Sequence, residues 1–167
     1  SAEGGCRTNI KLPGVQEELA REIIALNKPT VLVLFNGRPL DITELSQEAG
    51  AILEAWYPGT EGGNAVARVL FGEVNPQGRL SMSFPFNVGQ IPVYYNAYST
   101  GRPKHSEYGD KYKYESNRYN THYLDAPNAP AYPFGYGLSY TEYEYGELAL
   151  SSEVIALGEK LKVSLKV

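Results

Sequence analysis

The chain has 167 residues, of which 43% are hydrophobic and 20% charged, and its formal net charge is −4. Because this composition is ordinary for a globular protein and no run of Lys or Arg stands out, it argues against binding to nucleic acids or anionic membranes. The single cysteine, Cys6, excludes an internal disulfide framework and a thiolate metal cluster, and the two histidines lie too far apart to suggest a zinc site. No apolar stretch approaches the length of a transmembrane helix.

The first half of the chain alternates between patterns typical of helices and of strands. The expected elements are a helix over 15–27, a strand over 30–35, a short helix over 41–49, a strand over 51–56 whose composition also fits a helix, a helix over 64–71 and a strand over 79–84. In the first helix, helical spacing relates Val15, Leu19, Ile23 and Leu26. The run TVLVLF does not alternate, so both faces of that strand are expected to be covered, as in a parallel sheet. This order predicts an α/β layered domain.

The second half of the chain has a different character. Residues 85–133 are rich in Gly, Pro, Asn and Tyr, which predicts one long ordered loop or several short irregular ones, and such a segment is uncommon unless it is functional. Residues 147–150 and 160–167 then alternate polar and apolar side chains, as expected for the first two strands of a β-sandwich.

Several motifs resemble one known family. They are EGGCRTNIKLPGVQEEL, KPTVLVLFNGRPL, AILEAWYPGTEGGNAVARVLFGEVNPQGRLSMSFP, VGQIPVYYN and YPFGYGLSYT. Together they resemble glycoside hydrolase family 3, and within it the bacterial periplasmic β-glucosidases, which implies a periplasmic or secreted protein without a cofactor or metal. The family has an N-terminal barrel, an αβα sandwich and often a fibronectin type III-like domain. The resemblance assigns 1–141 to the second half of a mostly parallel sandwich and 142–167 to the first strands of a truncated third domain.

The resemblance also implies catalytic roles. Retaining glycosidases use two carboxylates, one as nucleophile and one as general acid/base. In the family the nucleophile is an aspartate of the barrel, which this chain lacks. Glu3 occupies the position of the acid/base, on a glycine-flanked loop before Arg7, although many members carry Asp where this chain has Cys6. The alternative is that Glu3 is a frayed terminal residue.

Other residues have weaker implied roles. A second EGG triplet contains Glu61, which is expected to lie at a helix N-terminus, where a carboxylate is stabilised structurally. Tyr94, Tyr95 and Arg102 are candidates to line the leaving-group subsite. Trp56 is expected to pack between sheet and helix, the alternative being sugar stacking. Arg7 either holds Glu3 or a neighbouring loop by an ion pair, or faces solvent.

The resulting hypothesis is a fragment of a retaining, exo-acting β-glucosidase that removes terminal non-reducing β-D-glucosyl residues from glucosides or oligosaccharides. The isolated chain is expected to be inactive, because its partner, the N-terminal barrel, is absent. Open sheet edges are expected to favour homo-oligomers or another partner chain. The competing hypothesis is a non-catalytic carbohydrate-binding or interaction module.

Overall fold

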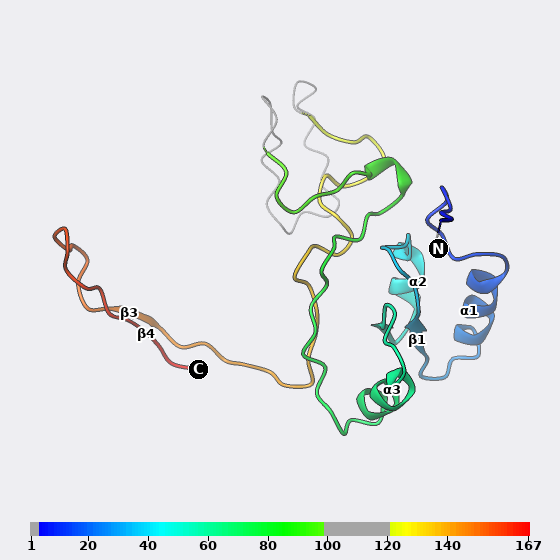
Figure 1. The fold of residues 1–167 in the computed structure, drawn as a ribbon, viewed down its shortest axis with the longest axis horizontal. Helices are drawn as coiled ribbons and strands as arrows, with labels where there is room; N and C mark the ends of the chain where they lie inside the picture. Colours follow the sequence, from blue (N-terminus) through cyan, green and yellow to red (C-terminus); the bar gives the residue numbers. More distant parts are fainter. Residues whose placement is uncertain (1–3, 99–120) are drawn as a thin grey trace.

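A computed structural model describes residues 4–98 and 121–167 of the chain (Figure 1). Its elements are mixed helices and strands, which confirms the α/β expectation at this coarse level. In chain order they are α1 (Gln16–Ile24), β1 (Val31–Leu34), α2 (Thr43–Glu48), β2 (Ala51–Glu54), α3 (Gly62–Leu70), the 3-10 helix η1 (Val88–Gln90), β3 (Leu148–Leu150) and β4 (Val163–Leu165). The strands form two separate two-stranded sheets, β1–β2 and β3–β4.

Strands β1 and β2 are parallel, as the continuous apolar run predicts, and α2 forms the connection between them. Val31 pairs with Ala51, and Leu34 with Glu54. Of the four residues of β1 only Leu34 is buried, whereas Val31 is 46% exposed. The expectation that both faces of this strand are covered is therefore wrong for the described structure, because a two-stranded sheet has too few neighbours to cover it.

A small core lies beside this sheet. Its buried members are Leu34, Leu40, Ile42 and Phe84, and Trp56 and Tyr132 pack against them. Phe84 is 2% exposed, and its ring centroid lies 6.0 Å from that of Trp56. The core therefore joins the end of β1, the segment leading into α2 and the irregular second half of the chain.

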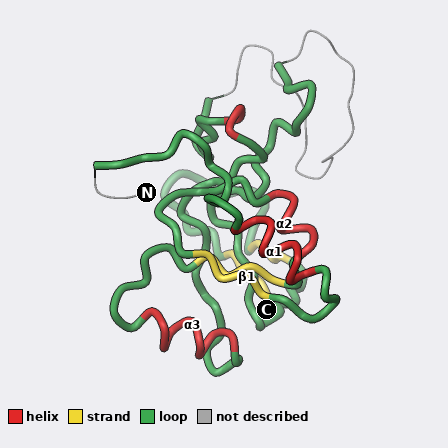
Figure 2. The backbone as a smooth tube through the Cα atoms, turned by 90° about the vertical axis from the view of Figure 1, so that its right-hand side faces the viewer, coloured by secondary structure: helices red, strands yellow, loops and turns green. Residues whose placement is uncertain are grey.

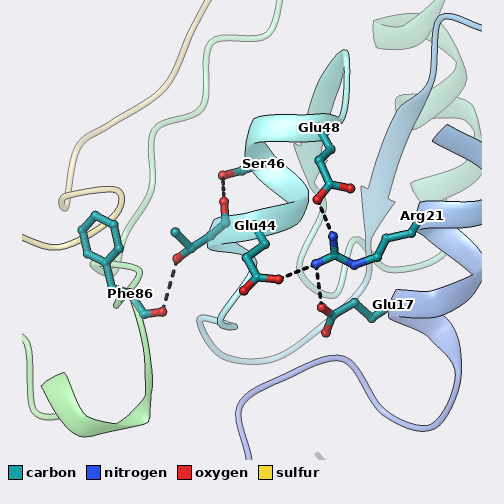
Figure 3. A network of polar contacts seen from close by, with 7 residues as sticks. Glu17, Arg21, Glu44, Ser46, Glu48 and Phe86 are labelled. Carbon is teal, nitrogen blue, oxygen red and sulfur yellow. Dashed lines mark hydrogen bonds and ion pairs between the residues drawn. The ribbon is translucent and has the colours of Figure 1, made fainter. Parts of the chain in front are cut away.

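Helices α1 and α2 lie side by side next to β1, whereas α3 lies apart from them (Figures 1 and 2). Arg21 of α1 reaches three carboxylates: those of Glu17 at 3.1 Å, Glu44 at 2.5 Å and Glu48. Glu44 and Glu48 belong to α2, so the guanidinium of Arg21 links the two helices by salt bridges (Figure 3). On the other side of α2, the hydroxyl of Thr43 donates to the carbonyl of Phe86 over 3.3 Å.

The third helix begins two residues before the expected position. Gly62 is required there, because a Cβ at this residue would lie 2.5 Å from the Cγ of Pro58. The helix ends before Gly72, whose φ of +76° is a conformation that glycine adopts without strain, as the sequence predicts.

The predicted strand over 79–84 is wrong. The backbone of Leu80 bonds to Tyr136 and Gly135, and that of Phe84 bonds to Tyr132, but only the Phe84–Tyr132 pair forms a bridge. A bend at residues 81–82 separates the two contacts, so a continuous ladder does not form.

The described parts of 85–133 are irregular but well connected, which confirms the expectation of ordered loops for those parts. Gln90 is 3% exposed and its side chain organises the segment. Its carbonyl oxygen accepts from the backbone N–H of Phe86 at 2.6 Å, and its amide donates to the carbonyls of Pro127 at 2.7 Å and Ala129 at 3.3 Å.

The C-terminal segment forms an extended arm that ends in the β3–β4 hairpin, far from α1, α2 and α3 (Figure 1). The strands are antiparallel, with Leu148 opposite Leu165, and every residue in them is exposed. The accessible surface of the chain is 13262 Å², whereas a compact protein of 18.4 kDa exposes about 8,000 Å². Much of its apolar surface therefore has no cover within the described structure.

Candidate active site

The four residues predicted for the site do not all fall in the described part of the chain. Glu3 and Arg102 lie outside it. Tyr94 and Tyr95 follow η1, with exposed fractions of 68% and 69%. Tyr95 stacks on Phe134, with ring centroids 4.2 Å apart and planes inclined by 18°. An exposed aromatic pair of this kind offers a flat apolar face to a sugar ring, but the same geometry also suits simple packing.

The carboxyl ends of β1 and β2 bring together polar residues that the sequence analysis did not select. Asn36 and Arg38 follow β1, and Glu54 is the last residue of β2. The amide of Asn36 donates to the carbonyl of Arg38 over 2.8 Å and to the Oε2 of Glu54 over 3.2 Å. Because ligands of open parallel sheets bind outside the carboxyl ends of the strands, this edge is the expected place for functional groups.

Arg38 links this edge to the N-terminal segment, which we define as residues 4–9. Its Nη1 lies 3.2 Å from the Sγ of Cys6, and its Nη2 donates to the carbonyl of Asn9 over 3.0 Å. The next residue, Ile10, is buried, and its carbonyl accepts from the N–H of Asp41 over 3.0 Å. The segment that leads to Glu3 is therefore attached to the loop between β1 and α2.

Glu54 is half-buried, and burial raises the pKa of its carboxyl above the ordinary value. Hydrogen bonds from the backbone N–H of Trp56 and the side chain of Asn36 oppose this shift, because both stabilise the ionised form. The bond from Trp56 to Oε1 is 3.0 Å long. Each oxygen of the carboxylate thus holds a different loop.

Trp56 has a φ of +51°, which is uncommon for a residue with a bulky side chain. The bond from its N–H to Glu54 stabilises this turn, and its ring packs on the core beside Phe84. The packing role expected for Trp56 is confirmed, although its partner is the core around Phe84 and not a helix.

Glu61 is the residue before the first turn of α3, as the sequence predicts. Its side chain does not cap the helix, because its carboxylate accepts from the side-chain amide of Asn64 at 2.7 Å instead of from a backbone N–H. The short spacing to Asn64 allows this alternative. Glu61 is thus engaged in a local structural contact.

Sequence reasoning missed Arg38, Asn36 and Glu54 as members of one cluster. A signal was available, since Asn36 and Glu54 come at the ends of two apolar runs, and parallel strands end at the same edge. Arg7, which the sequence analysis considered as an ion-pair partner, is exposed and forms no ion pair with a described carboxylate.

The described residues contain no group of three or more His, Cys, Asp or Glu side chains arranged to hold a metal ion. Within residues 4–98 and 121–167, no helix is long and apolar enough to cross a membrane.

The sequence matches the glycosyl hydrolase family 3 C-terminal domain over residues 1–140. The chain belongs to glycoside hydrolase family 3. A periplasmic beta-glucosidase of Salmonella typhimurium is 49% identical over 99% of the chain and 21% of its own length. A beta-xylosidase of Formosa agariphila is 42% identical, again over 99% of the chain and 21% of its own length.

Solved structures of family 3 enzymes have the same fold. The beta-glucosidase of Listeria innocua, in complex with isofagomine, superposes with a TM-score of 0.80 and 48% identity, over 99% of the chain and 22% of that protein. The chain spans about a fifth of the length of these relatives. Family 3 membership and the mixed α/β fold are thereby shown.

Proposed function

We propose that the chain is the C-terminal part of a retaining, exo-acting β-glucosidase, in which Glu3 is the general acid/base. The observation that carries this proposal is the match to the family 3 C-terminal domain over 1–140, together with relatives named as β-glucosidases and β-xylosidases. The substrate would be a terminal non-reducing β-D-glucosyl or related unit. The name of the Salmonella relative supports a periplasmic location.

The partner in this proposal is an N-terminal barrel that supplies the nucleophile. It is supported by the fraction of its relatives that the chain covers and by its large exposed apolar surface. Residues 1–141 would complete an αβα sandwich, and 142–167 would begin a fibronectin type III-like domain. The exposed leucines of β3 and β4 and the exposed stripe of α1 would then be covered by the rest of the protein.

The catalytic prediction concerns Glu3→Gln in the full-length protein. General acid catalysis contributes about 10²–10⁴-fold, so we expect kcat on alkyl β-glucosides to fall by a factor in this range. The loss in kcat/KM should be smaller on aryl glucosides, whose leaving group needs no proton. On these aryl glucosides azide should partly restore turnover, since it can attack the glycosyl-enzyme intermediate without a general base.

Glu61→Gln is the matched control, because it removes the carboxylate of the second EGG triplet, and its turnover should stay near that of the native protein. Unchanged turnover of Glu3→Gln on alkyl glucosides would remove Glu3 from the acid/base role. Binding of glucosides by the isolated chain, with no hydrolysis by the full-length protein, would favour the non-catalytic module. The isolated chain itself should not hydrolyse aryl glucosides.

A further inference from the structure

The N-terminal segment has little apolar packing to fix its position. Every residue from 4 to 9 is exposed, and the buried anchor begins only at Ile10. A catalytic group needs a position defined to within about 0.5 Å. Polar contacts therefore matter for the order of this segment: Gly5 takes part in a backbone β-bridge, and the contacts of Arg38 with Cys6 and Asn9 join the segment to the loop after β1.

Arg38 is suited to this task because its guanidinium presents donors in a rigid planar fork. Two of its nitrogens donate hydrogen bonds to the segment at points three residues apart, to the Sγ of Cys6 and to the carbonyl of Asn9. A pair of attachments fixes both position and direction, whereas a single one would allow the segment to pivot. Cys6 lies three residues from Glu3 in the sequence.

The backbone of Arg38 is itself held from the sheet. Its carbonyl accepts from Asn36, whose amide also donates to Glu54. Glu54 is fixed by the parallel pairing of Leu34 with Glu54 and by the following bond from the N–H of Ala55 to the carbonyl of Leu34 at 2.9 Å. Hydrogen bonds thus run from the end of β2 through Asn36 and Arg38 to the N-terminal segment.

We propose that Arg38 is a positioning residue for the acid/base, and that Asn36 and Glu54 support it by holding its backbone at the carboxyl ends of β1 and β2. This inference rests on the proposed role of Glu3. It assigns to the loop after β1 a part in setting the direction from which the acid/base reaches the glycosidic oxygen. Arg38 itself does not touch substrate in this proposal.

The contact with Cys6 allows a test in which a substitution strengthens the hydrogen bond to Arg38. A thiol is a weak hydrogen-bond acceptor, whereas a carboxylate accepts strongly from a guanidinium. Cys6→Asp should therefore tighten the segment when Arg38 is present. In Arg38→Met the same aspartate should have no such effect, because its cation is gone.

The experiment measures amide hydrogen exchange and kinetics in the full-length protein. Arg38→Met should accelerate exchange across residues 4–9 about tenfold, the factor that corresponds to the loss of one charge-assisted hydrogen bond. Exchange in α1 should stay unchanged, which shows that the fold is intact. Arg38→Lys keeps the charge and can reach one attachment point, so it should show an intermediate exchange rate.

The kinetic readout separates positioning from simple stability. For Arg38→Met we expect kcat on alkyl glucosides to fall about tenfold or more, with KM nearly unchanged. The loss in kcat/KM should be smaller on aryl glucosides, whose leaving group needs no proton. Arg38→Lys should recover part of this loss. Arg68→Met, on the exposed surface of α3, is the control and should leave both exchange and kcat unchanged.

The outcomes distinguish this inference from the proposed function. If Glu3→Gln loses activity but Arg38→Met leaves exchange and kcat unchanged, the positioning role is overturned while the function stands. If Glu3→Gln keeps full activity, the function fails and with it the catalytic meaning of the contact, even where Arg38→Met accelerates exchange. Slower exchange in Cys6→Asp that persists without Arg38 would also contradict the inference.

Discussion

Gln90 organises an irregular segment through one buried amide. It satisfies the N–H of Phe86 and the carbonyls of Pro127 and Ala129, three backbone groups from two parts of the chain. Buried polar groups that lose their partner cost about 1–3 kcal/mol each. This one side chain therefore joins residue 86 to residues 127 and 129.

The corresponding prediction is that Gln90→Leu lowers the free energy of unfolding by about 2–4 kcal/mol, because it leaves more than one backbone group buried without a partner. Urea unfolding of the full-length protein measures the loss, and exchange of the amides around Phe86 shows its location. Gln77→Leu, at an exposed position, should change stability by less than about 0.5 kcal/mol. Equal effects of the two variants would contradict the role given to Gln90.

Glu54 makes the stability of the fold depend on pH, and the sign of this dependence follows from its raised pKa. Folded Glu54 holds its proton more tightly than the unfolded chain does, so its contribution to stability is full below the ordinary value of 4.5 and is lost as the pH rises through the folded pKa. Between pH 4.5 and 7, stability should therefore fall less steeply in Glu54→Gln than in the native protein. Urea midpoints across this range measure the slope. Exposed Glu22→Gln is the control, and an identical slope in all three proteins would refute the prediction.

At the scale of elements, α1 and α2 are joined by a charged contact at the surface. Arg21 stands among Glu17, Glu44 and Glu48, so its removal would leave three carboxylates facing one another (Figure 3). Networks of ion pairs contribute more to the free energy of unfolding than isolated surface pairs do, but salt still screens them.

We expect Arg21→Met to lower the urea midpoint and to accelerate amide exchange in α1, because like charges then repel across the helix interface. The effect should shrink in 1 M NaCl, where the Debye length falls to about 3 Å. Arg68→Met removes a single exposed pair with Glu73, at 3.4 Å, and should have little effect at either salt concentration. A loss that does not depend on salt would mean that Arg21 acts through packing.

The elements that were predicted well are those with local causes. The helix start after Pro13, the end of α3 before Gly72 and the strand at 31–34 each depend on residues a few positions apart. The strand over 79–84 does not form, because the segment bends at its own residues 81–82 and meets residues 132–136 only on either side of that bend. Periodicity in one segment carries no information about the shape of the segment opposite.

At the scale of the whole molecule, the chain exposes much more apolar surface than a compact protein of its size. The apolar side chains of α1 have the spacing of a buried face, yet Leu19 and Ile23 are 58% and 44% exposed. The alternating residues of β3 and β4 are also exposed, Leu148 at 63%. A chain of this size normally buries roughly 70% of its unfolded surface, and this one buries about half.

The isolated chain is therefore expected to associate with itself, through the open edges of β1 and of the hairpin or through the stripe of α1. Light scattering over a dilution series should show a mass that rises with concentration. Leu148→Lys with Leu165→Lys, which places charge on an edge, should reduce the association if the hairpin contributes. A strict monomer at every concentration would contradict this expectation, and the full-length protein is the control, since its other parts would cover these surfaces.

The sequence by itself determined the α/β character, the order of the helices with their positions to within a few residues, and the family, because periodicity, turn residues and motifs are written in consecutive positions. Only the tertiary structure decided which residues surround the candidate site. Arg38 meets Cys6 across 32 positions, and Gln90 meets Pro127 across 37. The pattern at neither end of such a pair predicts its partner, since the meeting depends on how β1, β2 and the loops between them are placed. The position of Glu3 in its EGG triplet was thus readable from the sequence, whereas the support by Arg38 was visible only in the fold.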